Sequence, residues 1–239
     1  MKKVFGIIHF LFYGIFVALV AIPKSNRLQK AGAIDEKRSY ADMISKRWSK
    51  ILIEATGSTV EVIGLDNIPK EGPVLFVSNH QGYFDIPILL HHLPKSLGFL
   101  AKIEIAKWPV ISKWLACIEG VFIDRNDIRQ SLKAIKETTE SLKSGQSIVI
   151  FPEGTRSKSS ELNPFKPGSL KPAQKANVPI VPITIRNTYK ILEANNDRNI
   201  KPAAIKVIIS PAIDSNTISN ESSGDLITKV FQTIKHNLS

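Results

Sequence analysis

The sequence predicts an α/β fold: a mostly parallel mixed sheet flanked by helices, preceded by an N-terminal hydrophobic helix and an amphipathic helix. From Thr59 onward, short runs rich in β-branched residues alternate with helical stretches. These runs are apolar nearly throughout, which is typical of strands buried on both faces. With 239 residues and 43% apolar composition, the chain can build one sizeable core.

The N-terminal hydrophobic helix is expected over residues 4–22, which carry no formal charge and include His9 as their one strongly polar residue. A helix of this length is about 28 Å long, close to the thickness of a bilayer core. We expect a retained membrane anchor. A cleaved signal peptide and a helix lying in one leaflet are the alternatives. Basic residues flank both ends, so loop charge leaves its orientation open.

The amphipathic helix is expected over residues 35–56 and ends at Gly57. Its apolar side chains follow helical spacing opposite a lysine- and arginine-rich face: Tyr40, Met43, Ile44, Trp48, Ile51, Leu52 and Ala55. It is either a helix packed on the core or a helix on the membrane surface. The chain then divides into a membrane-anchoring helical segment, residues 1–57, and an α/β domain, residues 58–239.

The strands of the α/β domain are expected within seven apolar runs: residues 59–65, 73–79, 97–102, 117–125, 147–154, 179–186 and 204–210. Segments 127–144 and 168–177 have helical periodicity, and a last amphipathic helix follows a polar loop at 214–224. Polar residues gather where several of these strands end. Open α/β sheets place their functional sites at such ends.

Charge and cysteine content narrow the class of protein. Lys and Arg total 32 against 21 acidic residues, and a net charge of +11 favours an anionic partner such as a membrane or nucleic acid. The apolar N-terminus favours a phospholipid surface, so we expect no nucleic acid. The single cysteine, Cys117, excludes an intrachain disulfide, and its apolar setting predicts a buried small hydrophobe.

The first candidate site is the loop NHQGYFD, which follows the run 73–79. A glycine turn can fold His80 back onto Asp85, and a carboxylate bonded to one imidazole nitrogen leaves the other free to accept a proton. Asn79 could orient the loop. Asp85 could instead be a helix N-cap, and a His-Asp pair at this spacing also arises by chance.

Cations follow three other strands of the predicted sheet. Arg125 ends one run, Arg156 follows the turn Glu153-Gly154-Thr155, and Lys102 closes a third. Guanidiniums beside turn amides suit bidentate capture of a phosphate. The alternatives are ion pairs of Arg125 with Asp124 or Asp127, and of Arg156 with Glu153.

Four blocks in a fixed order give the sequence its family resemblance: NHQGYFD, GVFIDR, FPEGTRS and VPIVPI. Together they resemble the glycerolipid acyltransferase family with the HxxxxD motif, and within it the bacterial lysophosphatidate (1-acylglycerol-3-phosphate) acyltransferases. The blocks cover nearly half of the chain, from Asn79 to Ile183. Many members of the family have serine where this chain has Gly82.

The resemblance assigns roles to the candidate residues. It implies that His80 is the general base and Asp85 its orienting partner. It implies that Arg125, Arg156 and Lys102 bind a substrate phosphate, and that Glu153, Gly154 and Thr155 form an acceptor-binding turn. The block at 178–182 is interpreted as packing. Residues 58–239 would be the catalytic domain.

The implied reaction moves a fatty acyl group from a thioester, acyl-CoA or acyl carrier protein, to the sn-2 hydroxyl of lysophosphatidate and gives phosphatidate. It requires no metal and no organic cofactor. The implied location is the membrane, at the cytoplasmic face of a bacterial inner membrane. The alternatives are an acyltransferase for glycerol-3-phosphate or another lysophospholipid, and a non-catalytic membrane-anchored protein that binds anionic lipid.

Overall fold

The structure is a computed structural model that describes residues 13–197, 199–214, 217 and 222–239. Residues 4–12 of the expected anchor lie outside the described residues. From Tyr13 the chain is helical and continues through the π-helical turn η1 (Val17–Ala21) into α2 (Ile22–Lys30). None of the described helices is both long and apolar enough to cross a membrane. The hydrophobic helix over residues 4–22 therefore stays a prediction.

The described residues form one sheet of seven strands. These are β1 (Thr59–Ile63), β2 (Leu75–Ser78), β3 (Leu97–Lys102), β4 (Val121–Ile123), β5 (Ser147–Ile150), β6 (Ile180–Arg186) and β7 (Ala204–Ile209). Their order is β1-β7-β6-β2-β5-β3-β4, and every neighbouring pair is parallel except the antiparallel pair β6 and β7. The predicted mostly parallel mixed sheet is confirmed.

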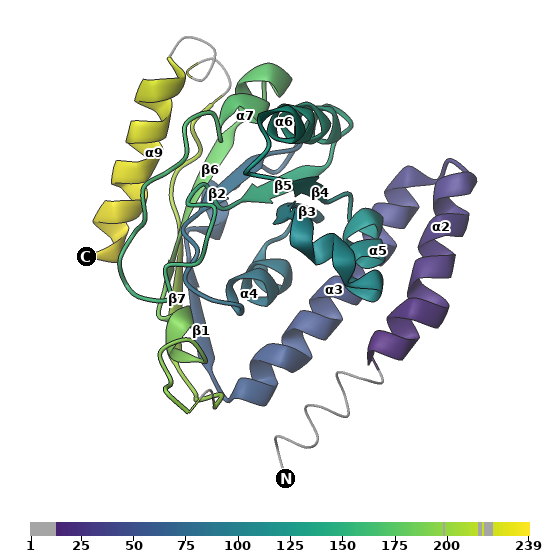
Figure 1. Cartoon of the computed structure of the whole chain (residues 1–239), viewed down its shortest axis with the longest axis horizontal. Coiled ribbons are helices and arrows are strands. Elements are labelled where there is room, and N and C mark those ends of the chain that lie inside the picture. Colours follow the sequence, from purple (N-terminus) through teal and green to yellow (C-terminus); the bar gives the residue numbers. More distant parts are fainter. Residues whose placement is uncertain (1–12, 198, 215–216, 218–221) are drawn as a thin grey trace.

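Helices cover both faces of the sheet, as Figure 1 shows. One face carries α3 (Ile34–Thr56), α4 (Asp85–His92) and α5 (Pro109–Cys117), and the other carries α6 (Ile128–Lys143), α7 (Lys171–Ala176) and α9 (Ser223–Leu238). Short 3-10 turns are η2 (Leu65–Asn67), η3 (Ile103–Lys107) and η4 (Thr188–Lys190). Each face of the sheet has its own buried cluster, so the strands are buried on both sides.

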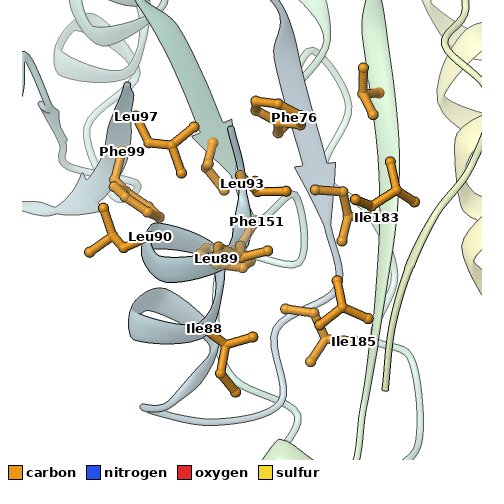
Figure 2. Close-up of a cluster of buried hydrophobic side chains, with 14 of the residues drawn as sticks. Phe76, Ile88, Leu89, Leu90, Leu93, Leu97, Phe99, Phe151, Ile183 and Ile185 are labelled. Carbon is orange, nitrogen blue, oxygen red and sulfur yellow. The ribbon is translucent and has the colours of Figure 1, made fainter. Parts of the chain in front are cut away.

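Helix α4 is fixed in place by the core that lies between it and the sheet. Ile88 and Leu89 of α4, and Leu93 directly after it, belong to the same buried cluster as Phe76 of β2 and Ile183 of β6 (Figure 2). All five side chains are at most 1% exposed. Each such burial stabilises the fold by about 1.5–3 kcal/mol. The first residue of α4 is therefore held rigidly beside the end of β2.

The amphipathic helix exists as α3, but the predicted apolar stripe is buried only in part: Ile44 is 6% exposed, and Tyr40, Trp48, Ile51 and Leu52 are half-buried. Ala41, Ser45, Ser49 and Ile53 are buried, whereas Met43 is 55% exposed. The buried stripe is lined by small residues, which allow neighbouring helices to approach closely, and Ser45 accepts a hydrogen bond from the Trp114 indole of α5 at 3.2 Å. Apolar periodicity therefore predicted the helix and part of its buried face, but not the buried serines.

The N-terminal helical segment packs on α3 and α5 through a small third cluster. Val17, Ala21 and Ile22 lie in this cluster with Ile44 of α3 and Cys117 of α5. Cys117 is 4% exposed, which confirms the prediction of a buried small hydrophobe. The N-terminal helical segment thus packs on the same side of the sheet as α4.

Strand direction brings the predicted site residues to one edge. Strands β2, β3, β4, β5 and β6 are mutually parallel, so their carboxyl ends share one edge of the sheet. In register, Val77 of β2 pairs with Ile150 of β5, and Ser78 pairs with Ile183 of β6. The loops after β2 and β5 consequently begin side by side at the centre of the sheet.

Candidate active site

His80 and Asp85 meet in the loop between β2 and α4. The Nδ1 atom of His80 lies 2.7 Å from Oδ2 of Asp85, and the imidazole stacks on the Phe151 ring with 4.0 Å between centroids. The His80 side chain keeps 16% of its surface exposed, while Asp85 is fully buried. The pair therefore combines a buried carboxylate with an imidazole that solvent or a substrate can reach.

Asp85 does not act as a helix N-cap. An N-cap carboxylate accepts hydrogen bonds from amides that follow it, but Oδ2 of Asp85 accepts from the preceding amides of Gln81 (2.7 Å) and Gly82 (2.9 Å). Its Oδ1 accepts a short hydrogen bond from the Thr188 hydroxyl. Thr188 begins η4, just after β6, and is also fully buried. Asp85 thus holds the loop through hydrogen bonds from His80, Gln81 and Gly82 to its carboxylate.

The contacts of Asp85 decide which imidazole nitrogen is free. A carboxylate only accepts hydrogen bonds, so Nδ1 of the neutral His80 must carry the proton that it donates to Asp85. The lone pair then lies on Nε2. A histidine held in this tautomer is suited to take a proton from a substrate hydroxyl.

Asn79 fastens the start of the loop to the neighbouring strand. Its amide nitrogen donates to the Ile185 carbonyl at 2.9 Å, and its oxygen accepts from the Ile185 amide at 2.7 Å. The predicted orienting residue therefore prolongs the pairing of β2 with β6 through its side chain. On the other side, the amides of Ser157 and Lys158 donate to the carbonyls of His80 (2.7 Å) and Gln81 (3.1 Å).

Glu153, in the loop after β5, links that loop to the loop after β2. It is 4% exposed, and its two oxygens accept from the His80 amide at 2.6 Å and the Asn163 amide at 3.0 Å. Burial raises the pKa of the Glu153 carboxyl, and these two hydrogen bonds partly oppose the rise. Its contacts hold backbone, so Glu153 fixes the position of His80.

The side chains of Lys166 and Arg125 both lie next to Gly154, in the turn after β5. A Cβ on Gly154 would lie 2.8 Å from Cε of Lys166 and 3.1 Å from Nη1 of Arg125. Neither cation forms an ion pair with any residue that the structure describes. Asp124 and Asp127 instead accept backbone amides, the latter at the N-terminus of α6. Burial lowers the pKa of Arg125, and the negative charge of Glu104 partly offsets this lowering. Two unpaired positive groups side by side favour an anionic ligand.

Arg156 and Lys102, unlike Arg125 and Lys166, each form an ion pair with a carboxylate. Nη1 of Arg156 lies 3.2 Å from Oε1 of Glu193, and its guanidinium stacks 3.5 Å above the centre of the Tyr83 ring. Lys102, at the end of β3, is 56% exposed and forms an ion pair with Glu104 at 2.5 Å. Thr155 lies exposed in the same turn as Gly154. The predicted ion pair of Arg156 with Glu153 is replaced by one with Glu193.

Four residues of the site were not found from the sequence: Phe151, Lys166, Thr188 and Glu193. Phe151 comes directly after β5 and Thr188 two residues after β6, and position near a strand end is a signal that could have found them. Lys166 and Glu193 lie within long connections. Their sequence neighbourhood gives no signal, because only the folded loops bring them to the site.

Comparison with known proteins decides the family. The model of the family described as Acyltransferase matches residues 59–186, which is more than half of the chain. The chain belongs to the acyltransferase family. The matched region contains His80, Asp85, Arg125 and Arg156, whereas Thr188 and Glu193 follow it.

Named relatives of this acyltransferase chain come from distant organisms. The 1-acyl-sn-glycerol-3-phosphate acyltransferase of Borreliella burgdorferi is 30% identical, over 78% of this chain and 77% of its own. A chloroplastic protein of the same name from Brassica napus is 38% identical over 74% of this chain, and the match spans about half (51%) of that relative's length. The crystal structure of the 1-acyl-sn-glycerophosphate acyltransferase PlsC from Thermotoga maritima superposes with a TM-score of 0.77 at 26% identity, covering 100% of this chain and 96% of that one.

Proposed function

We propose that this chain transfers a fatty acyl group from a thioester, acyl-CoA or acyl carrier protein, to the sn-2 hydroxyl of 1-acylglycerol-3-phosphate, giving phosphatidate. The observation that carries the proposal is the His80–Asp85 pair, which presents a free Nε2 at a strand edge where cations also gather. The names of the relatives support the same reaction.

The proton transfer follows from the tautomer of His80. An alcohol has a pKa far above 7, so its oxygen needs a base as it attacks the thioester carbonyl. Nε2 of His80 takes the hydroxyl proton, and the Asp85 carboxylate stabilises the imidazolium that forms. The new C–O bond forms as the C–S bond breaks. The leaving thiolate, whose thiol has a pKa of about 8.5, recovers the proton from Nε2.

The acceptor phosphate is assigned to the cations around Gly154, with Arg156, two residues further along, as an additional ligand. Arg125 offers a planar fork of N–H donors and Lys166 a point charge, and both are unpaired within the described part of the chain. A phosphate monoester carries about two negative charges, so it would neutralise both groups. Holding the acceptor by its phosphate lowers the entropic part of the barrier to attack.

Membrane access is assigned to the helices beside the site. Trp108 is 58%, Val110 36% and Ile111 41% exposed, in or next to α5, and Lys107 and Lys113 lie among them. Helix α5 contacts η1 and α2, where Leu19 and Val20 and other apolar side chains are exposed as well. Exposed apolar groups mixed with lysines suit the surface of an anionic bilayer, here proposed as the cytoplasmic face of the membrane.

The function is tested by product identity. The purified protein is offered lysophosphatidate, glycerol-3-phosphate and a zwitterionic lysophospholipid with acyl-CoA and with acyl carrier protein, and products are measured by mass spectrometry. Phosphatidate is the expected product.

The role of the base is tested with His80→Ala. We expect a loss of acyl transfer of about 10²- to 10⁴-fold, because the general base is gone. Vesicle binding should stay as in the wild type, and the protein should still fold, because Asp85 keeps its hydrogen bonds from the Gln81 and Gly82 amides and the Thr188 hydroxyl. Activity that survives His80→Ala would exclude the proposed mechanism.

A further inference from the structure

Glu193 has a buried carboxylate beside the active-site loop. This carboxylate takes no part in the proposed proton transfer. It lies in the connection between η4 and β7, and its side chain is 5% exposed. Removing a carboxylate from water costs free energy unless hydrogen bonds replace its hydration. The contacts of Glu193 therefore indicate what the chain gains from it.

One oxygen of Glu193 holds the loop and an arginine together. Oε1 accepts from the Tyr83 amide at 2.7 Å and from Nη1 of Arg156 at 3.2 Å. The other side of the same guanidinium is covered by the Tyr83 ring, with Cζ 3.5 Å from the ring centre. Arg156 is thus fixed between a carboxylate and an aromatic face, which restricts a side chain that otherwise has many rotamers.

The second oxygen of Glu193 is buried and has no hydrogen-bond partner among the described residues. A carboxylate that served only to stabilise the fold would have both oxygens satisfied. A carboxylate kept with one unsatisfied oxygen, beside an active site, is typical of a functional constraint.

The same oxygen explains the glycine in the loop. A Cβ on residue 82 would lie 2.6 Å from Oε2 of Glu193 and 3.0 Å from its Cδ. Any side chain at this position would displace the carboxylate. Gly82 and Glu193 therefore belong together, and the serine that is common at this position in the resembling family does not fit here.

We propose that Glu193 is a positioning residue for Arg156: it holds the guanidinium so that the remaining N–H donors face the phosphate of the acceptor. Arginine has five such donors, and Glu193 occupies one of them in this structure. This inference rests on the proposed function, because it takes a phosphate-bearing lipid as the ligand. Gly82 is needed for this positioning, since the absence of a side chain leaves room for the Glu193 carboxylate.

The first test is Glu193→Gln, which keeps the shape of the side chain and an oxygen for the Tyr83 amide but removes the charge that holds Arg156. We expect the KM for lysophosphatidate to rise about fivefold, with kcat and the donor KM within about twofold of the wild type. The control is Glu161→Gln, an equal change of charge at an exposed glutamate, which should leave all three constants unchanged.

The coupling is tested with Arg156→Ala. If Glu193 acts through Arg156, Glu193→Gln should add nothing to the acceptor KM once Arg156 is alanine. Gly82→Ser should also raise the acceptor KM, and it should cost less in a Glu193→Ala background, because the clash is removed. An equal effect of Glu193→Gln with and without Arg156 would overturn the proposal, as would a fall in the acceptor KM.

A binding measurement separates this inference from the proposed reaction. Calorimetry with a short-chain lysophosphatidate gives the affinity of each variant without turnover. If the wild type transfers no acyl group, the proposed reaction fails, whereas a weaker affinity of Glu193→Gln still supports the positioning role. Wild-type turnover together with unchanged affinity in Glu193→Gln and an unchanged acceptor KM would overturn the positioning role alone. A melting temperature lowered by Glu193→Gln, without an effect on the ligand, would make Glu193 structural.

Discussion

At the scale of single residues, the position of His80, the proposed base, depends on Asp85. Its buried carboxylate accepts from the His80 ring, from two loop amides and from the Thr188 hydroxyl. Leaving a buried carboxylate without partners would cost several kcal/mol, and four donors remove most of that cost. The loop can therefore keep an ionised group at full burial, and that group keeps His80 in one tautomer.

Lys166 gives a prediction at this scale. Lys166→Gln should raise the KM for lysophosphatidate about three- to tenfold, because it removes one of the two unpaired charges beside Gly154. The measurement is steady-state kinetics with acceptor and donor varied separately. Lys175→Gln, on the exposed side of α7, makes the same change of net charge and should have no effect. Equal effects of both substitutions would mean that only the overall charge matters.

The sequence predicted which residues come together in the loop after β2 better than it predicted their partners from other elements. His80, Asp85 and Asn79 lie in one loop, so their proximity could be predicted from spacing alone. Thr188 reaches Asp85 because β6 lies next to β2, and strand order is not written in local periodicity. Glu193 likewise meets Arg156 only after the chain has turned back from β6.

At the scale of elements, the predicted strands and helices formed where apolar runs and helical periodicity placed them. The exception is the inner face of α3, where Ser45 and Ser49 are buried and Met43 is exposed. Sequence patterns weight side chains by hydrophobicity, whereas close packing of helices selects small ones. Size complementarity between two helices depends on both partners, so one helix read alone does not show it.

Helix α3 is tied to the α5–β4 turn by an ion cluster, and this gives a prediction about pH. Glu119 lies 2.8 Å from Arg38 and 3.3 Å from Lys37, with 16% of its side chain exposed. Burial raises the pKa of the Glu119 carboxyl, but hydrogen bonds and charge from Arg38 and Lys37 outweigh burial and hold this pKa below its usual value. A depressed pKa means that Glu119 stabilises the fold above the pKa of the unfolded chain and loses this effect as pH falls through the folded pKa.

Glu119→Gln should therefore lower the free energy of unfolding by about 2 kcal/mol at pH 7, or the melting temperature by about 5 °C. The difference from the wild type should shrink as pH falls below about 4. Scanning calorimetry across this pH range measures it. Glu137→Gln removes an exposed pair with Lys133 at 3.7 Å and should shift the melting temperature by less than 2 °C, about the worth of a surface pair. A pH-independent effect of Glu119→Gln would contradict the charge argument.

At the scale of the whole molecule, the N-terminal helices and the sheet share their packing. Ala41 and Ile53 of α3 belong to the core cluster that covers the sheet, while η1 and α2 pack on α3 and α5. The division of the chain at Gly57 into an anchoring segment and a catalytic domain stays a prediction. The π-helical turn η1, which exposes Leu19 and Val20, contacts α5, and α5 lies on the face of the sheet that also carries α3 and α4.

Membrane attachment gives the prediction at this scale. The double substitution Trp108→Ser with Ile111→Ser should weaken binding to vesicles of anionic phospholipid about tenfold, because two exposed apolar side chains can no longer enter the bilayer. Turnover of a short-chain, water-soluble acceptor should stay within about twofold. Co-sedimentation with vesicles measures the binding.

The control for this prediction is Ile200→Ser, at a residue that is 47% exposed and precedes β7, away from α5. It should leave vesicle binding unchanged. If it weakens binding as much as the double substitution does, attachment is not located at α5.

The loop from Asn79 to Tyr83 is held largely through its main chain: the amides of His80, Gln81, Gly82 and Tyr83 all donate to carboxylates. The Tyr83 side chain, 58% exposed, adds little to this framework. Directed evolution could therefore vary residue 83 widely while His80, the proposed base, keeps its geometry. Because the Tyr83 ring covers the Arg156 guanidinium, such variants would alter the proposed phosphate contact and leave the His80–Asp85 pair in place.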